Sequence, residues 1–232
     1  MIGVRNIQKN YGTKVALNIS HLDIRKGDCI GLVGNNGAGK TTLLSLMLDL
    51  IKANNGHIES KGIKVNTSDD WKNYTGSYLD ERFLIPHLTA REYLDFVGSL
   101  HGLDTGKVDK FLKENSGFFE AELFVRKKYI RDLSTGNKNK VGILSTLLSA
   151  PELIILDEPF ASLDPTSQAW LKNRLVRAKE GGSTMILSSH DLNHVTDVSN
   201  RVVLLENGEL VKDLATDSET LSELEHYFML DK

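Results

Sequence analysis

The sequence predicts an α/β protein with a parallel sheet, an antiparallel β part near its N-terminus and a helical subdomain inserted into the core. Short apolar runs, typical of strands buried on both faces, alternate with segments of helical periodicity. A glycine-rich loop joins one such run to the helix after it. Because strands that alternate with helices form parallel βαβ units, these patterns favour one α/β domain over residues 1–232.

Composition excludes several classes of protein. The chain carries 28 Lys and Arg against 31 Asp and Glu, a formal charge of −3, and 40% of its residues are hydrophobic. This balance is typical of a globular chain rather than a disordered one, and the single cysteine, Cys29, excludes a disulfide framework. A nucleic-acid partner is not expected, since such binders usually carry a basic excess.

No apolar run approaches the roughly 18 residues that span a bilayer. The N-terminus also lacks the charged and then apolar layout of a signal peptide. We therefore expect a cytoplasmic location.

The first third of the chain is predicted to form strands. Apolar residues fall near alternating positions before the Tyr11-Gly12 turn, a second apolar stretch covers Leu17–Ile24, and Cys29–Val33 is continuously apolar. A helix is predicted after the glycine-rich loop, where apolar residues recur at helical spacing: Leu43, Leu44, Met47, Leu48 and Ile51.

The middle of the chain is predicted to be mostly helical. Thr89 and Glu92 form a capping-box pattern, and apolar residues of one helix face follow it. We interpret 88–149 as the inserted helical subdomain, with 1–87 and 150–232 forming the α/β core. The basic run Arg126-Lys127-Lys128 is interpreted as a solvated helix face.

The last third returns to α/β alternation. Leu153–Leu156, Thr184–Leu187 and Arg201–Leu205 are predicted strands. Asp164-Pro165 is typical of a helix start, and the helix is expected to run to about Lys179. Asn207-Gly208 predicts a tight hairpin turn after the last of these strands.

The glycine-rich loop has the pattern Gly, four residues, Gly-Lys and then Thr. Glycines let the backbone curl so that its N–H groups surround phosphate oxygens, and the following helix directs its positive end at the same anion. Lys40 would supply a charge to the β- and γ-phosphates, and the Thr41 hydroxyl would bind Mg²⁺. The alternative is a flexible turn that happens to precede a lysine. The candidate ATP-binding residues of this segment are Gly34, Asn35, Asn36, Gly37, Ala38, Gly39, Lys40, Thr41 and Thr42.

Two carboxylates, Asp157 and Glu158, follow the predicted strand Leu153–Leu156. The carboxyl ends of parallel strands are where α/β proteins bind ligands. Asp157 is therefore the candidate Mg²⁺ ligand, through water, and Glu158 the candidate base for the water that attacks the γ-phosphate. By itself this pair could be an ordinary acidic turn.

Together with three further segments, these motifs resemble the ATP-binding cassette (ABC) ATPases, the nucleotide-binding subunits of ABC transporters. Leu133-Ser134-Thr135-Gly136-Asn137 is similar to the family signature Leu-Ser-Gly-Gly-Gln, and Ser162-Leu163-Asp164 is similar to its D-loop. His190 occupies the position of the family's switch histidine, and Tyr11 that of the aromatic ring stacked on adenine. The resemblance covers essentially the whole chain.

The resemblance implies a P-loop NTPase with a RecA-like core that hydrolyses ATP with Mg²⁺. It implies a homodimer or heterodimer of ATPase subunits, head to tail, in which Ser134 and Gly136 contact the ATP held by the other chain. His190 would bind the γ-phosphate and orient Glu158. The subunit would act on a separate transmembrane permease at the inner face of the cell membrane, with export as the preferred direction.

Some residues depart from the family pattern. Thr135 replaces the first glycine of the signature and Asn137 its glutamine. Glu81 stands where many members have the glutamine that binds Mg²⁺, and its carboxylate is also an oxygen ligand. Two alternatives remain open: a soluble ABC ATPase of translation or DNA repair, and a regulatory subunit that binds ATP without turnover.

Overall fold

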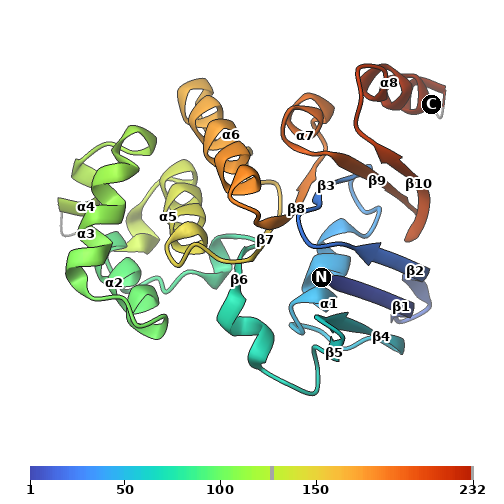
Figure 1. Ribbon diagram of the computed structural model, residues 1–232, viewed down its shortest axis with the longest axis horizontal. Helices are drawn as coiled ribbons and strands as arrows, with labels where there is room; N and C mark the ends of the chain where they lie inside the picture. The colour runs from blue at the N-terminus through green and yellow to red at the C-terminus, as the bar shows by residue number, and fades with distance from the viewer. Residues whose placement is uncertain (126–127, 231–232) are drawn as a thin grey trace.

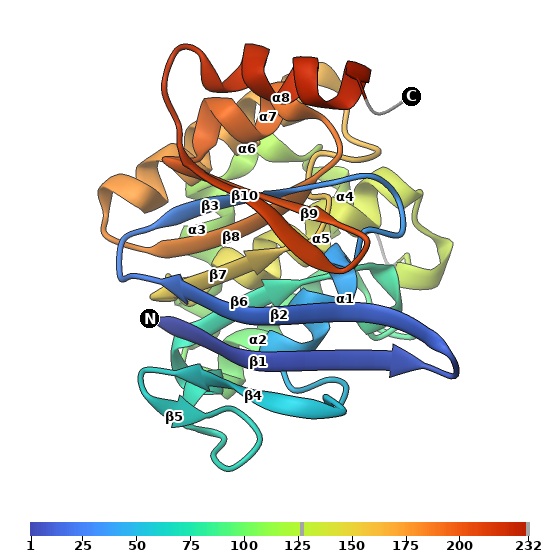
Figure 2. The same ribbon diagram turned by 90° about the vertical axis from the view of Figure 1, so that its right-hand side faces the viewer.

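The computed structural model describes residues 1–125 and 128–230 and contains two sheets (Figures 1 and 2). Arg126 and Lys127 of the predicted basic face lie outside the described residues. The four-stranded sheet is antiparallel, with the order β2-β1-β4-β5. Its strands are β1 (Ile2–Tyr11), β2 (Lys14–Ile24), β4 (Asn55–Ser60) and β5 (Ile63–Lys64).

The central sheet has the order β10-β9-β3-β8-β7-β6, and all its pairings are parallel except that of β10 with β9. This arrangement confirms the predicted parallel sheet and the Asn207-Gly208 hairpin. The six strands are β3 (Cys29–Val33), β6 (Thr75–Tyr78), β7 (Leu153–Leu156), β8 (Thr184–Ser189), β9 (Arg201–Glu206) and β10 (Glu209–Ala215).

Helices cover both faces of the central sheet. Helix α1 packs between the two sheets, whereas α6, α7 and α8 lie on the opposite face (Figure 2). Helices α2 to α5 lie together at the left of Figure 1, and α5 also packs against β6 and β7. The α-helices are α1 (Lys40–Met47), α2 (Ala90–Leu100), α3 (Thr105–Glu114), α4 (Glu122–Val125), α5 (Thr135–Leu147), α6 (Pro165–Glu180), α7 (Leu192–Val198) and α8 (Thr220–Leu230).

Burial on both faces explains why the central strands are continuously apolar. Along β7, Leu153 and Ile155 belong to the core that contains α1 and the antiparallel sheet. Ile154 and Leu156 face the other core, which is built on α5 and α6. Because successive side chains of a strand point to opposite faces, each run fills two cores and carries its polar residues only at its end.

Local sequence signals set several helix boundaries. Thr89 and Glu92 form the predicted capping box at the start of α2, and Asp164 caps α6 by accepting a hydrogen bond from Ser167 N at 2.9 Å. One boundary differs from the prediction: α1 ends at Met47, and Ile51 lies outside it. The backbone at Asp49 has φ +50°, which stops the helix despite the continuing apolar spacing.

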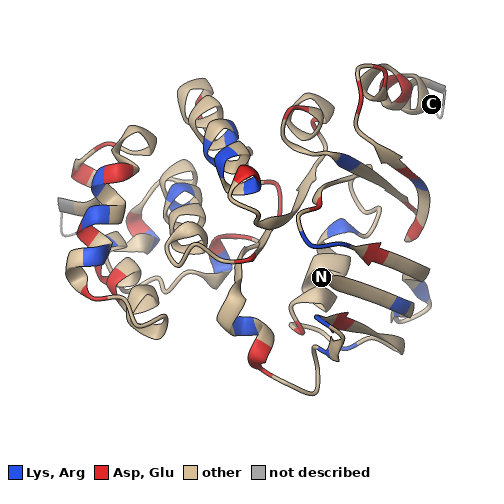
Figure 3. Cartoon of the chain, in the orientation of Figure 1, with Lys and Arg blue, Asp and Glu red and all other residues tan. Residues whose placement is uncertain are grey.

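Charged residues of both signs are interspersed along the strands and helices (Figure 3). Within residues 1–125 and 128–230, no helix combines the length and the apolar character needed to cross a bilayer.

Helix α5 approaches the central sheet closely at Gly142. A Cβ atom on Gly142 would lie 2.1 Å from Cε2 of Tyr78, a ring buried at the end of β6. Helix propensity alone would favour alanine by about 1 kcal/mol. We expect Gly142→Ala instead to lower the free energy of unfolding by about 1–3 kcal/mol, because the ring has to move within a packed core. Urea unfolding checks this.

Gly106→Ala in α3 is the control, because the nearest atom to its added Cβ is Asp104 Oδ1 at 3.3 Å. Its stability should stay within about 0.5 kcal/mol of the parent chain. A Gly142→Ala protein as stable as this control would contradict the packing argument.

Candidate functional site

The glycine-rich loop connects β3 to α1 at the carboxyl edge of the central sheet. Gly37 has φ +85° and Gly39 has φ +111°, and residues with a Cβ atom rarely adopt these backbone angles. Gly39 precedes the first residue of α1, and no side chain caps this helix end. The backbone N–H groups at the start of α1 are therefore available to an anion, which the helix dipole also favours.

The β9–β10 hairpin supports the loop through backbone contacts. Gly208 N donates to Ala38 O at 3.0 Å, and within the loop Ala38 N donates to Asn35 O at the same distance. A Cβ on Gly34 would lie 2.2 Å from Leu205 O, so only glycine fits between the loop and this strand. The curled conformation is thus fixed by the surrounding chain.

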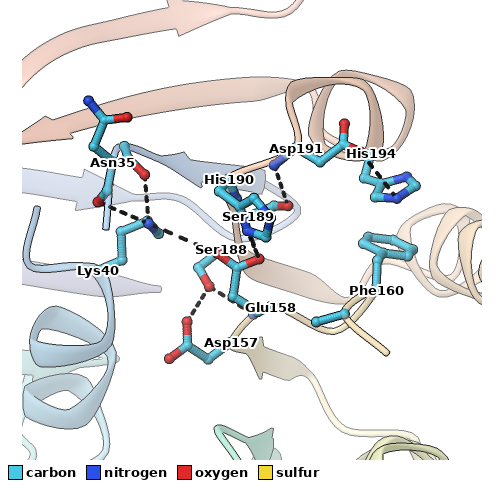
Figure 4. Close-up of polar contacts among 12 residues, drawn as sticks. Asn35, Lys40, Asp157, Glu158, Phe160, Ser188, Ser189, His190, Asp191 and His194 are labelled. Carbon is cyan, nitrogen blue, oxygen red and sulfur yellow. Dashed lines mark hydrogen bonds and ion pairs between the residues drawn. The ribbon is translucent and has the colours of Figure 1, made fainter. Parts of the chain in front are cut away.

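Lys40 directs its ammonium group back into the loop. Its side chain is almost fully buried, and Nζ donates to Gly34 O at 2.6 Å and to Asn35 O at 3.4 Å. Glu158 Oε1 lies 4.0 Å from the same nitrogen (Figure 4). The residue thus places a positive charge between the loop and the acidic pair.

Asp157 lies at the end of β7 and is held from two sides. Thr41 Oγ1 donates to its Oδ2 at 2.5 Å. The Ser188 hydroxyl, from the neighbouring β8, donates to its Oδ1 (Figure 4). Burial raises the pKa of Asp157, and these two hydrogen bonds partly oppose that shift. A hydroxyl and a carboxylate at this spacing fit Mg²⁺, which prefers oxygen ligands and retains several waters.

Glu158 and His190 are in direct contact. His190 Nδ1 lies 2.9 Å from Glu158 Oε2, and the histidine side chain is otherwise largely exposed (Figure 4). The backbone of Glu158 is left-handed, with φ +47°, and its N–H donates to Ser188 Oγ at 2.9 Å. Ser188 therefore fixes both members of the acidic pair, a role that the sequence pattern did not reveal.

A cavity of about 330 Å³ joins these segments, a volume within the range of small-molecule sites. Two of its residues were not predicted: Lys14 and Ala16 lie on β2, where Lys14 is paired with Tyr11 across the hairpin. The predicted residues that line it are Tyr11, Asn36, Gly37, Gly39, Lys40, Thr41, Thr42, Asp157 and Glu158.

Glu81 and His190 are placed differently. His190 lines a neighbouring cavity together with Gly34 and Asn35. Glu81 follows β6, and its Oε2 lies 3.2 Å from Lys138 Nζ. The candidate metal ligand is thus paired with a residue of α5 rather than with the lining of the cavity beside the glycine-rich loop (the candidate phosphate cavity).

The signature-like segment begins α5. Ser134 precedes the helix, and its Oγ accepts a hydrogen bond from Asn137 N at 3.3 Å, while its own hydroxyl hydrogen can still donate. Thr135, the departure from glycine, begins the helix with ordinary negative φ. Gly136 packs so closely on Ser162 that an added Cβ would lie 2.7 Å from Ser162 O. Neither Ser134 nor Gly136 lines the chain's own phosphate cavity.

Comparison with known proteins is unambiguous at the family level. A family model described as ABC transporter matches residues 17–161. The ABC transporter ATP-binding protein YhaQ of Bacillus subtilis is 34% identical, over 91% of this chain and 70% of its own. The linearmycin resistance ATP-binding protein LnrL, also of Bacillus subtilis, is 32% identical over 91% and 68%. The lantibiotic transport ATP-binding protein SrtF of Streptococcus pyogenes is 30% identical over 97% and 95%.

Solved structures confirm the fold. An ATP-binding subunit of an ABC transporter superposes with a TM-score of 0.84 at 25% identity and covers 100% of both chains. The dimeric ATP-binding cassette MJ0796, in a post-hydrolysis state bound to ADP and Pi, superposes with a TM-score of 0.79 at 25% identity and covers 94% of this chain and 100% of its own. This protein therefore belongs to the ABC transporter family as one of its ATP-binding chains.

Proposed function

We propose that this protein hydrolyses ATP to drive a substrate through a separate membrane permease. One observation carries the proposal: Lys40, Thr41, Asp157 and Glu158, from segments more than 100 residues apart, border a single cavity. A phosphate-binding loop beside a buried carboxylate and a second, catalytic carboxylate is the set of groups that ATP hydrolysis requires.

The contacts suggest a role for each group. The loop N–H groups and Lys40 bind the phosphate oxygens, and Tyr11, which is 53% exposed at the edge of the cavity, stacks on the adenine. Thr41 and Asp157 would hold Mg²⁺, which would neutralise phosphate charge when bound. Glu158 accepts the proton of the attacking water, and His190 orients the Glu158 carboxylate through their 2.9 Å contact.

The functional unit is proposed to be a head-to-tail pair of ATPase subunits. Ser134 and Gly136 start a helix of 13 residues yet lie outside the chain's own phosphate cavity. We propose that their hydroxyl and N–H groups contact a nucleotide held by another chain, since a helix start favours an anion. Glu81 is the further proposed Mg²⁺ ligand, and it would have to leave its contact with Lys138 to reach the metal.

Export is the proposed direction, and a permease at the inner face of the membrane is the proposed partner. Two relatives carry the support, since their names associate them with lantibiotic transport and linearmycin resistance. A nucleic acid is not among the proposed partners, because the formal charge of the chain is −3.

The first test removes the proposed base. Glu158→Gln should lower the steady-state rate of ATP hydrolysis by at least about 100-fold, because the amide cannot accept the proton. ATP affinity should stay within about twofold, since the phosphate contacts remain, and ATP should now trap a dimer visible by size-exclusion chromatography. The control is Glu152→Gln, which alters an exposed carboxylate paired with Lys61. Normal hydrolysis by Glu158→Gln would remove this residue from its role.

The second test removes the phosphate charge partner. Lys40→Ala should weaken ATP binding roughly 10- to 100-fold, which corresponds to the usual 1.5–3 kcal/mol of a charged hydrogen bond. Isothermal titration calorimetry measures the affinity. Lys172→Ala, which breaks an ion pair between α6 and Asp197 of α7 and does not alter the cavity lining, is the control and should bind ATP normally. Equal affinities for the two variants would exclude Lys40 from phosphate binding.

The third test concerns the partner and the direction. After mild solubilisation, the chain should co-purify with an integral membrane protein. When the pair is reconstituted in vesicles, substrate should move away from the side that receives ATP. Recovery with ribosomes or DNA would favour the soluble alternative, and movement toward the ATP side would establish import.

A further inference from the structure

The start of α5 is tied to three different segments by three consecutive side chains. Lys138 Nζ lies 3.2 Å from Glu81 Oε2, and Lys140 Nζ lies 3.2 Å from Asp164 Oδ2. Between them, Asn139 reaches the loop that follows Glu158. None of the three side chains lines the phosphate cavity, so a direct contact with the chain's own nucleotide does not explain them.

Asn139 makes the most buried of these connections. Only 7% of the residue is exposed, and its Nδ2 donates to two backbone oxygens, Pro159 O at 3.1 Å and Ala161 O at 2.7 Å. One amide group uses both of its hydrogens on a single loop, and that loop begins directly after the proposed catalytic carboxylate.

The loop needs such support because its backbone is strained at both ends. Glu158 has φ +47° and Ser162 has φ +60°, and neither is glycine. A left-handed conformation at such residues persists only where surrounding contacts impose it. Asn139 supplies one of these contacts, and the close packing of Gly136 on Ser162 O supplies another. Both come from the first turns of α5.

We propose that Asn139 is a positioning residue that sets the Glu158 carboxylate for water activation. The inference rests on the proposed function. Its physical basis is that the amide fixes Pro159 and Ala161, the residues that follow the left-handed Glu158, so the carboxylate keeps one orientation toward His190. A displacement of about 1 Å of a catalytic group is enough to cost roughly 100-fold in rate.

A consequence concerns the proposed pair of subunits. The same helix presents Ser134 and Gly136 at its start and holds the catalytic loop through Asn139 about one turn later. When the nucleotide of the other chain binds Ser134 and Gly136, it therefore contacts the helix that also holds the loop after this chain's own Glu158. Helix α5 links the two proposed ATP sites mechanically through Asn139.

The experiment uses Asn139→Leu, which keeps the number and branching of the side-chain heavy atoms and removes both N–H donors. We expect kcat for ATP hydrolysis to fall roughly 10- to 100-fold. KM and the ATP affinity measured by calorimetry should stay within about twofold, since the phosphate contacts are unchanged. Asn139→Ala, whose smaller side chain imposes no clash, repeats the measurement if the leucine variant folds poorly.

Thr146→Val is the matched control. Thr146 is also buried on α5, and its Oγ1 donates to Gly142 O at 3.0 Å, so valine likewise removes a buried hydrogen bond from the same helix. The control should lose stability, as judged by urea unfolding, and keep kcat within about twofold. A kcat that falls equally in the control and the Asn139 variants would assign Asn139 to packing alone.

A double-mutant cycle tests whether Asn139 acts through Glu158. In the Glu158→Gln background, Asn139→Leu should leave the residual hydrolysis rate unchanged within about twofold, because no base remains to be positioned. Rate losses that multiply would overturn the proposal, and so would a loss of ATP affinity in proportion to kcat. Absence of hydrolysis by the unaltered chain would instead refute the proposed function, so the two failures are distinguishable.

Discussion

The hydrogen bond between Thr41 and Asp157 is the contact on which the arrangement of the site depends. It joins residues 116 positions apart, one at the start of α1 and the other at the end of β7. The two residues can meet only because β3 and β7 are parallel and both flank β8, so that their carboxyl ends reach the same edge of the sheet. Ser188, at that edge of β8, completes the join through its bond to Asp157.

Because Asp157 is buried, its hydrogen bond with Thr41 also compensates a carboxylate that is largely removed from solvent. Asp157 is 8% exposed, and desolvation raises its pKa. An ionised carboxylate in such a place has to be compensated by donors or by a cation. The strands beneath the site are apolar on both faces, so the charged groups of the site lie at the carboxyl ends of these strands. The same sequence pattern, an apolar strand followed by polar residues, thus produces both the buried core and the polar site at its edge.

The sequence predicted what depends on neighbours along the chain. The glycine pattern before Lys40, the capping box at Thr89 and the Asn207-Gly208 turn are each encoded within a few residues, and the structure contains all three. The strands β4, β5 and β6 were not predicted. They are short or of mixed polarity, and their pairing partners rather than their own apolar pattern fix them.

Contacts between distant segments explain what sequence reasoning missed in the site. Ser188 ends a buried apolar run and carries no motif; only the order of the strands brings it to Asp157. Glu81 was expected beside the metal, whereas the fold brings Lys138 within ion-pair distance of it. Likewise, Lys138, Asn139 and Lys140, which follow the signature-like segment, carry no motif of their own. Their partners, the loop after Glu158 among them, become visible only once α5 is packed.

The support that the β9–β10 hairpin gives to Ala38 and Gly34 has a thermodynamic consequence. Because the main chain of the glycine-rich loop is already ordered, the loop loses little conformational entropy when a nucleotide binds. Most of the free energy of nucleotide binding is then available to drive a conformational change in another part of the assembly. In the proposed transport cycle, that work would be to bring two subunits together and to move the permease coupled to them.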